Sequence, residues 1–388
     1  MNKDKHQICT RCILDTSDEP SINFDEHGVC NYCINYDKSA AEFIFRDEGR
    51  EEKLHQVISK IKSCGKGKKY DCVLGVSGGV DSTFLAYKVK QFGLRPLVVH
   101  LDNGWNSELA VKNIEGILEK LGFDLYTYVI DWEEFKDLQL SFLKASVIDL
   151  EVTSDHAIFS CLHRIAKENK IKYIISGFNI VTEGVLPVSW RWHKLDWLNI
   201  KSIHKRFGTK KLKTFPRLSF FQLNYFMLAL KIETVHLLNF IPYEKTKAKE
   251  LITNKLGWRD YGGKHYESII TRFYQGYILP TKFNVDKRKA HLSTLICSGQ
   301  ITRNEALQEL EKPIYDSKQL KSDKEFVLKK FGLSEKEFNS LMALPIKRHD
   351  EYPSYLTKHY IYHEKFFKAI RPFTKATKSV YNIFRQGK

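Results

Sequence analysis

The sequence predicts an α/β protein built on a parallel β-sheet. Short apolar runs alternate with segments of helical period, an arrangement typical of βαβ units with helices on both faces of the sheet. Strands are expected at residues 70–76, 97–101, 125–130 and 173–175, and helices at 41–61, 82–91, 107–121 and 155–169. Cysteine pairs precede this region, and an aromatic, basic and finally helical region follows it. We therefore expect domains at 1–40, 41–186 and 187–388.

The length and composition indicate a folded protein whose two halves differ in net charge. The 388 residues are 43% hydrophobic, enough to fill large cores, and their formal net charge is +16. Residues 1–186 hold 23 basic and 28 acidic side chains, whereas residues 187–388 hold 39 and 18. The basic half would suit an anionic substrate, nucleic acid or an anionic membrane surface, and charge alone does not choose among them.

The sequence predicts neither secretion nor a transmembrane segment. Residues 1–40 are polar and contain cysteines, unlike a signal peptide, so a cytoplasmic location is expected. The most apolar stretch, 218–230, is closed by Arg217 and Lys231 and is too short to span a bilayer. It is interpreted as a core helix rather than an interfacial one.

Four of the eight cysteines predict a zinc site. Cys9, Cys12, Cys30 and Cys33 form two C-x-x-C motifs with 17 residues between them, a spacing that suits tetrahedral zinc. Four thiolates leave no open coordination position, so the zinc should be structural. A disulfide pair is disfavoured without a secretory signal. The single cysteines are interpreted as structural: Cys64, Cys72, Cys161 and Cys297.

The loop Ser77-Gly-Gly-Val-Asp-Ser82 lies between an expected strand and an expected helix. Its glycines allow backbone N–H groups to converge on an anion at the helix N-terminus. The hydroxyls of Ser77 and Ser82 add donors, and Asp81 would cap the helix or hold magnesium. A Walker A loop carries a lysine here that reaches the β and γ phosphates. Its absence favours pyrophosphate as the leaving group, with transfer of AMP.

This loop resembles the PP-loop of the N-type ATP pyrophosphatases, which include GMP, NAD and asparagine synthetases and tRNA-thiolating enzymes. The resemblance implies a five-stranded parallel sheet of the adenine nucleotide alpha hydrolase type, ATP and Mg²⁺ as cofactors, and an adenylated substrate. Ligands of such sheets bind at the carboxyl ends of the strands. The expected nucleotide contacts are Ser77, Gly78, Gly79, Val80, Asp81, Ser82, His100, Asp102, Asn103, Gly177 and Asn179.

Six further segments resemble the N-acetyl sugar amidotransferase family, whose members act in bacterial surface polysaccharide synthesis. They are residues 176–179, 181–184, 192–196, 261–267, 273–280 and 286–291. The similarity covers roughly residues 5 to 310 and is most discriminating from Tyr261 to His291. It implies an acetamidino sugar as the product, made for lipopolysaccharide O-antigen or a related glycan.

The implied reaction has two steps. The carbonyl oxygen of a sugar acetamido group attacks the α-phosphorus of ATP, and ammonia then displaces AMP. The expected catalytic residues are Ser77, Asp81, Ser82, Lys264 and Arg288, with Asp81 holding magnesium and Asp155 as a weaker candidate. The nucleotide sugar or nonulosonic acid would meet Glu183, His265, Lys287 and His291.

The source of ammonia is expected to lie outside this chain. Residue 2 is Asn, and no single cysteine sits in a Gly-x-Cys-x-Gly elbow, so the chain lacks a glutaminase nucleophile. The family resemblance implies a separate glutaminase subunit and a cyclase-like barrel subunit. Two alternatives stay open: a tRNA-modifying PP-loop enzyme, either a thiolase or a lysidine-type ligase, and a non-catalytic zinc-bearing interaction protein. No nucleic acid is expected as the partner.

Overall fold

The computed structural model describes residues 6–44, 49–262 and 266–356. At its centre is a five-stranded sheet of order β3-β2-β1-β4-β5, in which all neighbouring strands are parallel. The strands are β1 Cys72–Gly75, β2 Pro96–Asp102, β3 Asp124–Val129, β4 Tyr173–Ile175 and β5 Glu233–Val235. This sheet confirms the predicted fold class. Strand order reverses beside β1, the position where open parallel sheets bind their ligands.

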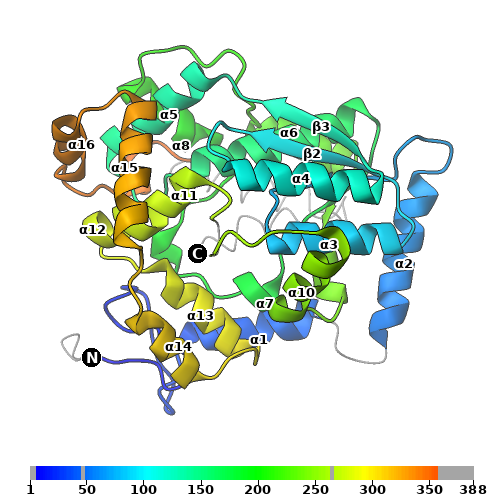
Figure 1. The fold of residues 1–388 in the computed structure, drawn as a ribbon, viewed down its shortest axis with the longest axis horizontal. Coiled ribbons are helices and arrows are strands. Elements are labelled where there is room, and N and C mark those ends of the chain that lie inside the picture. The colour runs from blue at the N-terminus through cyan, green and yellow to red at the C-terminus, as the bar shows by residue number, and fades with distance from the viewer. Residues whose placement is uncertain (1–5, 45–48, 263–265, 357–388) are drawn as a thin grey trace, which may run out of the picture.

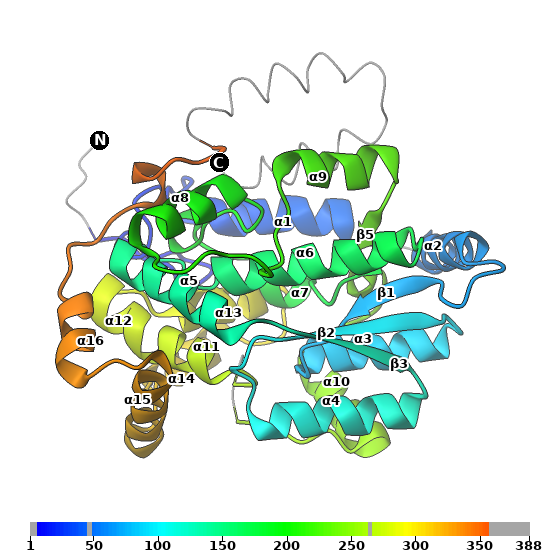
Figure 2. The ribbon, with the colours of Figure 1, turned by 90° about the horizontal axis from the view of Figure 1, so that it is seen from above.

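Helices cover both faces of the sheet (Figure 2). On one face lie α3 Val80–Gln91, α4 Glu108–Leu121 and α10 Lys245–Leu256; on the other lie α5 Trp132–Ala145 and α6 Val152–Glu168. Successive strand residues point to opposite faces. Val73 accordingly packs in the core beneath α6, whereas Leu74 packs in the core beneath α3 and α4. Burial on both faces explains why the central strands β1, β2 and β4 are mostly apolar.

Local sequence sets the ends of the helices. The hydroxyl of Ser107 accepts a hydrogen bond from the N–H of Ala110 and caps α4, which ends at Gly122 in the left-handed conformation. Asp131 caps α5 in the same way through the N–H of Glu134. Helix α5 was not among the expected elements, and the single helix expected at 41–61 is replaced by α1 Asn31–Phe43 and α2 Gly49–Cys64.

The second half of the chain is mostly helical. The short helix α7 Ile180–Glu183 precedes it, and its remaining α-helices are α8 Trp197–Phe207, α9 Phe220–Asn224, α11 Ile269–Phe273, α12 Leu279–Phe283, α13 Lys287–Cys297, α14 Arg303–Glu311, α15 Ser317–Phe331 and α16 Glu335–Met342. Helices α11, α12, α15 and α16 lie together at the left of Figure 1. Strand β5 also comes from this half, so the domain boundary expected at residue 186 cuts through the sheet.

The apolar stretch 218–230 forms α9 and a π-helical turn, Tyr225–Ala229. Phe220 and Phe226 are buried, but Phe221 is 83% exposed and Tyr225 is 49% exposed. The predicted core helix is therefore buried on one face only. Across the described residues, we find no helix with the length and apolar character needed to cross a membrane.

Candidate functional site

The predicted phosphate loop follows β1 and leads directly into α3. Gly78 has φ +81°, and a Cβ there would lie 3.1 Å from Cγ1 of Ile114 and 3.2 Å from the carbonyl oxygen of Ala110. The hydroxyl of Ser82 accepts from the N–H of Ser77 at 3.3 Å and donates to the carbonyl of Gly79 at 3.1 Å. The loop thus curls around Ser82 at the N-terminus of a 12-residue helix, where backbone N–H groups favour an anion.

Three aromatic side chains from distant parts of the chain hold this loop. Nε1 of Trp258 donates to the carbonyl of Gly78 at 2.9 Å, and the hydroxyl of Tyr261 donates to the same oxygen. The hydroxyl of Tyr243 donates to the carboxylate of Asp81. Burial and the negative charge of Asp81 raise the pKa of Tyr243, which keeps its proton on the phenol. A magnesium ion at Asp81 would share that carboxylate with Tyr243.

The carboxyl end of β2 forms a turn with its own hydrogen bonds. Nε2 of His100 accepts from the amide of Asn106 at 3.0 Å, so Nδ1 donates to the carbonyl of Val76 at 3.1 Å. Asp102 accepts from the N–H of Gly104 at 2.8 Å. His100, an expected nucleotide contact, therefore braces the strand just before the phosphate loop.

Asn103 has contacts on both sides of this turn. Its side-chain oxygen accepts from the N–H of Trp105 at 3.2 Å. Its amide nitrogen donates to the hydroxyl of Ser154, on α6, at 3.4 Å.

At the carboxyl end of β4, the structure brings Gly177 to the phosphate loop, because its Cβ position lies 3.5 Å from backbone atoms of Ser82. Asn179 is completely buried and caps α7, accepting from the N–H and the hydroxyl of Thr182 at 2.9 and 3.1 Å. These contacts fix the start of α7, and a role of Asn179 in nucleotide binding stays a prediction. Glu183 ends α7 and adds to the negative charge around Tyr243.

A polar cluster at the start of α6 contacts the first residue of α13. Nζ of Lys287 contacts Glu151 at 2.6 Å, and the amide of Gln275 donates to the same carboxylate at 3.0 Å. Nζ of Lys194 bridges Asp149 at 2.8 Å and Asp155 at 3.0 Å. Lys287 and Asp155 were expected in the site, whereas the other members were missed.

Gln275 lies in the segment 273–280, one of those that carry the family resemblance. This segment contains the π-helical turn Tyr274–Ile278, and π-bulges are frequent at functional sites. His291, one turn along α13 from Lys287, has its Nδ1 3.4 Å from the carbonyl of Thr182 on α7. The predicted substrate residues Lys287 and His291 therefore contact the N-cap of α6 and the helix α7, respectively.

Arg288 does not join them. Its Nε and Nη2 donate to the carboxylate of Asp286 at 3.1 and 2.8 Å, and Nη1 donates to the carbonyl of Lys312 at 2.8 Å. These bonds fasten α13 to the end of α14, and the expected catalytic role of Arg288 stays a prediction. Lys264 and His265 lie outside the described residues.

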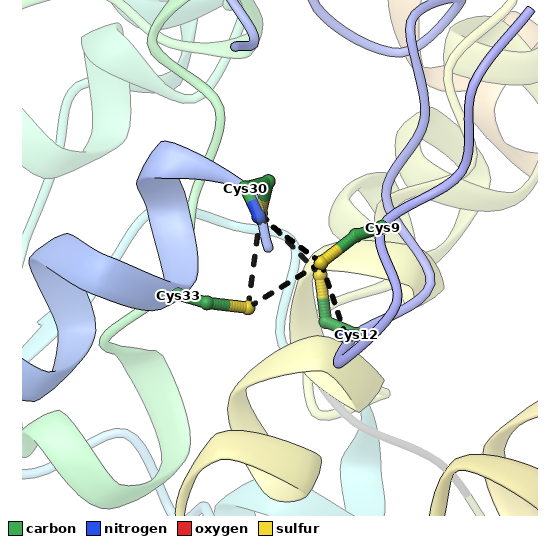
Figure 3. Close-up of side chains that lie close together, drawn as sticks. All are labelled: Cys9, Cys12, Cys30 and Cys33. Atoms are coloured by element: carbon green, nitrogen blue, oxygen red, sulfur yellow. Dashed lines mark hydrogen bonds between the residues drawn. The ribbon is translucent and has the colours of Figure 1, made fainter. Parts of the chain in front are cut away.

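The four N-terminal cysteines converge (Figure 3). All four are buried and their Sγ atoms lie within 4.8 Å of one another. The Cys12–Cys30 and Cys30–Cys33 sulfur distances are both 3.7 Å. Tetrahedral ligands at Zn–S distances of about 2.3 Å would lie about 3.8 Å apart. The cluster thus fits the predicted structural zinc. Cys297 is not isolated, since its Sγ lies 3.6 Å from that of Cys33.

Helix α13 connects this cysteine cluster to the site. Nζ of Lys289 contacts Asp15 at 2.8 Å and Asp18 at 3.0 Å, and both carboxylates are buried. Burial opposes ionisation of Asp15, but hydrogen bonds from Lys289 and Ser17 outweigh it and hold the pKa at about 2. The same helix carries Cys297 at its other end.

The parallel sheet of order β3-β2-β1-β4-β5 and the lysine-free loop between β1 and α3 are the features that the PP-loop resemblance predicts. Residues 267–368, about a quarter of the chain, match the family described as LPS biosynthesis protein WbpG-like, C-terminal domain. An uncharacterized protein of Methanocaldococcus jannaschii, MJ1599, is 24% identical over 306 residues, which cover 79% of this chain and 93% of that protein.

Two further comparisons involve enzymes. The tRNA(Ile)-lysidine synthase of Thermus thermophilus is 30% identical over 110 residues, or 28% of this chain and 20% of that enzyme. The structure of the NH3-dependent NAD synthetase of Campylobacter jejuni has a TM-score of 0.29 and 16% identity, covering 53% of this chain and 84% of that one. The family match and the enzyme similarity each cover only about a quarter of the chain, so its activity is a proposal.

Proposed function

We propose that this protein adenylates the carbonyl oxygen of a sugar acetamido group and lets ammonia displace AMP, which yields an acetamidino sugar for a bacterial surface glycan. One observation carries the proposal: the WbpG-like segment joins the nucleotide-binding edge of the sheet. The N–H of Ser107 donates to the carbonyl of Glu267 at 2.8 Å, and the N–H of Ile269 donates to that of Trp105 at 2.9 Å. Residues 267–368 thus begin beside the β2 turn.

The protein would promote this reaction by positioning the two substrates and by stabilising the negative charge of the phosphates. As the acetamido oxygen bonds to the α-phosphorus, the bond from that phosphorus to the bridging oxygen of pyrophosphate breaks. Backbone N–H groups of the loop, at the positive end of α3, would receive the leaving pyrophosphate. Magnesium, held through Asp81, would neutralise the phosphate charge.

In the second step ammonia adds to the imidate carbon and loses a proton, and the carbon–oxygen bond to AMP breaks. The polar cluster of Glu151, Gln275 and Lys287 presents donors and acceptors suited to sugar hydroxyls or to a sugar carboxylate. Ammonia would come from a separate glutaminase subunit through a barrel-shaped partner, as the family resemblance implies.

The test uses the purified full chain with ATP, Mg²⁺ and ammonium chloride, and a panel of nucleotide-linked acetamido sugars and nonulosonic acids. We expect AMP, pyrophosphate and a sugar in which one oxygen is replaced by NH, identified by mass spectrometry. Ser82→Ala should abolish this turnover, whereas Ser63→Ala, an exposed change on α2, should not. AMP formation that needs no sugar would contradict the proposal.

A lysidine-type ligase is the second candidate, favoured by the 110-residue similarity to tRNA(Ile)-lysidine synthase. It predicts AMP release that depends on tRNA and free lysine, with affinity that falls steeply as salt is added. The same assay with tRNA in place of the sugar separates the two reactions. Turnover with tRNA, and none across the sugars, would replace the proposed function by this one.

A further inference from the structure

A lysine from the C-terminal half lies against the turn at the end of β2, residues 102–105, and is surrounded by aromatic side chains. Nζ of Lys330, on α15, lies 4.5 Å from the ring centre of Trp132, 4.7 Å from that of Trp105 and 5.6 Å from that of Phe326. Its ammonium group also donates to the carbonyl of Gly104. The contact joins residues 226 positions apart in the chain.

The turn itself is built for this close approach. Gly104 has φ +78°, and a Cβ there would lie 3.2 Å from Trp132 and 3.3 Å from Nζ of Lys330. Only glycine therefore allows the backbone to reach both groups. Asp102, at the start of the turn, accepts from the N–H of Gly104 and supplies a negative charge near the lysine. Lys330 consequently holds the carbonyl side of the turn, while Asp102 holds its N–H side.

The surroundings make the ammonium an effective anchor. Trp105 is completely buried, and its Nε1 donates to Gln139 at 2.8 Å, which fixes the orientation of the ring. Its ring centre is 5.2 Å from those of both Trp132 and Phe331. Ring faces stabilise a cation that has lost water. Because packing holds these rings in place, the rings keep Lys330 in a fixed position relative to the turn.

We propose that Lys330 is a positioning residue for ATP: it holds the turn 102–105 in the conformation that receives the adenosine. This inference rests on the proposed function only in placing the nucleotide at the β2 turn. The aromatic ring system makes α15, from the WbpG-like segment, part of the nucleotide site without touching the reacting atoms. Loss of the ammonium frees the carbonyl of Gly104 and lets the turn sample other conformations.

The experiment measures ATP affinity by equilibrium dialysis, without sugar or ammonia, and then the KM values for ATP and ammonium and kcat. Lys330→Met keeps the length of the side chain and removes its charge. We expect it to weaken ATP binding and raise the KM for ATP about tenfold or more, the effect of losing a charged hydrogen bond, with the KM for ammonium unchanged. Lys330→Arg should recover part of the affinity.

The matched control is Lys329→Met, which changes an exposed neighbour on the same helix and should bind ATP like the wild type. Amide hydrogen exchange in the turn should quicken in Lys330→Met and not in the control. If Lys330→Met does not fold, Phe326→Leu removes one partly exposed ring of the system and should weaken ATP binding in the same direction.

Lys330→Met that folds and binds ATP as tightly as the wild type would overturn the positioning role, whatever the sugar assay shows. Wild-type chain that binds ATP but converts no sugar would overturn the proposed function and leave this test intact. Wild-type chain that binds no ATP would overturn both.

Discussion

Replacing Gly78 by alanine tests whether the phosphate loop depends on a backbone that only glycine accepts. The change has two costs. A left-handed conformation costs an L-residue about 1–2 kcal/mol. The new methyl group would also lie 3.1 Å from Ile114 and 3.2 Å from the carbonyl oxygen of Ala110, and overpacking of this kind costs about 1–3 kcal/mol. Since α4 holds that oxygen, the loop must move away.

Two other glycines separate these costs. Gly67 has φ +76° and nothing within 4 Å of its Cβ position, so Gly67→Ala carries the conformational cost alone. Gly116 lies within α4, also with nothing within 4 Å, and Gly116→Ala should stabilise the helix by up to about 1 kcal/mol. The assay is urea unfolding of each variant, combined with ATP binding and ATP-dependent pyrophosphate release.

We expect the unfolding free energy to be highest in Gly116→Ala, followed by the wild type, then Gly67→Ala, and lowest in Gly78→Ala. Nucleotide binding should be lost only in Gly78→Ala. If Gly78→Ala unfolds like Gly67→Ala and still binds ATP, the contact with α4 does not shape the loop and the reasoning is refuted.

Three other predictions concern the supporting structure. Burial lowers the pKa of His156 to about 4 from an unfolded value of 6.5, so the unfolding free energy should fall by roughly 3 kcal/mol as pH drops from 6.5 to 4, which urea titrations at several pH values will show. His156→Gln should flatten that slope. Chelation of metal, or Cys12→Ser, should lower the melting temperature, and unchanged melting would contradict a structural zinc. Lys289→Met leaves Asp15 and Asp18 buried without their cation and should lower the unfolding free energy at pH 7 by about 3–5 kcal/mol, measured by denaturant unfolding. An unchanged unfolding free energy would contradict the ion pairing.

Sequence patterns identified the three buried central strands and the six-residue edge strand β3, but missed the three-residue edge strand β5. Val73 and Leu74 belong to opposite cores, so β1 is apolar throughout and easily recognised. Strand β5, Glu233–Val235, is three residues long, lies at the sheet edge and is largely exposed. A strand of that kind leaves no apolar run for a pattern to detect.

The functional loop was recognisable for a different reason: its glycines and serines are contiguous. The groups that hold it are not, because Tyr243 and Trp258 reach the loop across 162 and 180 residues of chain. Their contacts depend on α10 packing against α3, which local composition does not encode. The different contacts of adjacent residues were equally hard to predict. Lys287 and Arg288 differ by one helical step, yet one contacts the polar cluster and the other fastens α14.

Helix α13 links the cysteine module to the predicted substrate residues. The helix has 11 residues, roughly 16 Å of length, with Lys287 at one end and Cys297 at the other. Cys297 lies beside Cys33, and Lys289 is bound by the buried carboxylates of the same module. Rotation or sliding of the helix would break these contacts and move Lys287 from Glu151. The cysteine module therefore acts as a fixed base that sets the position of the predicted substrate residues.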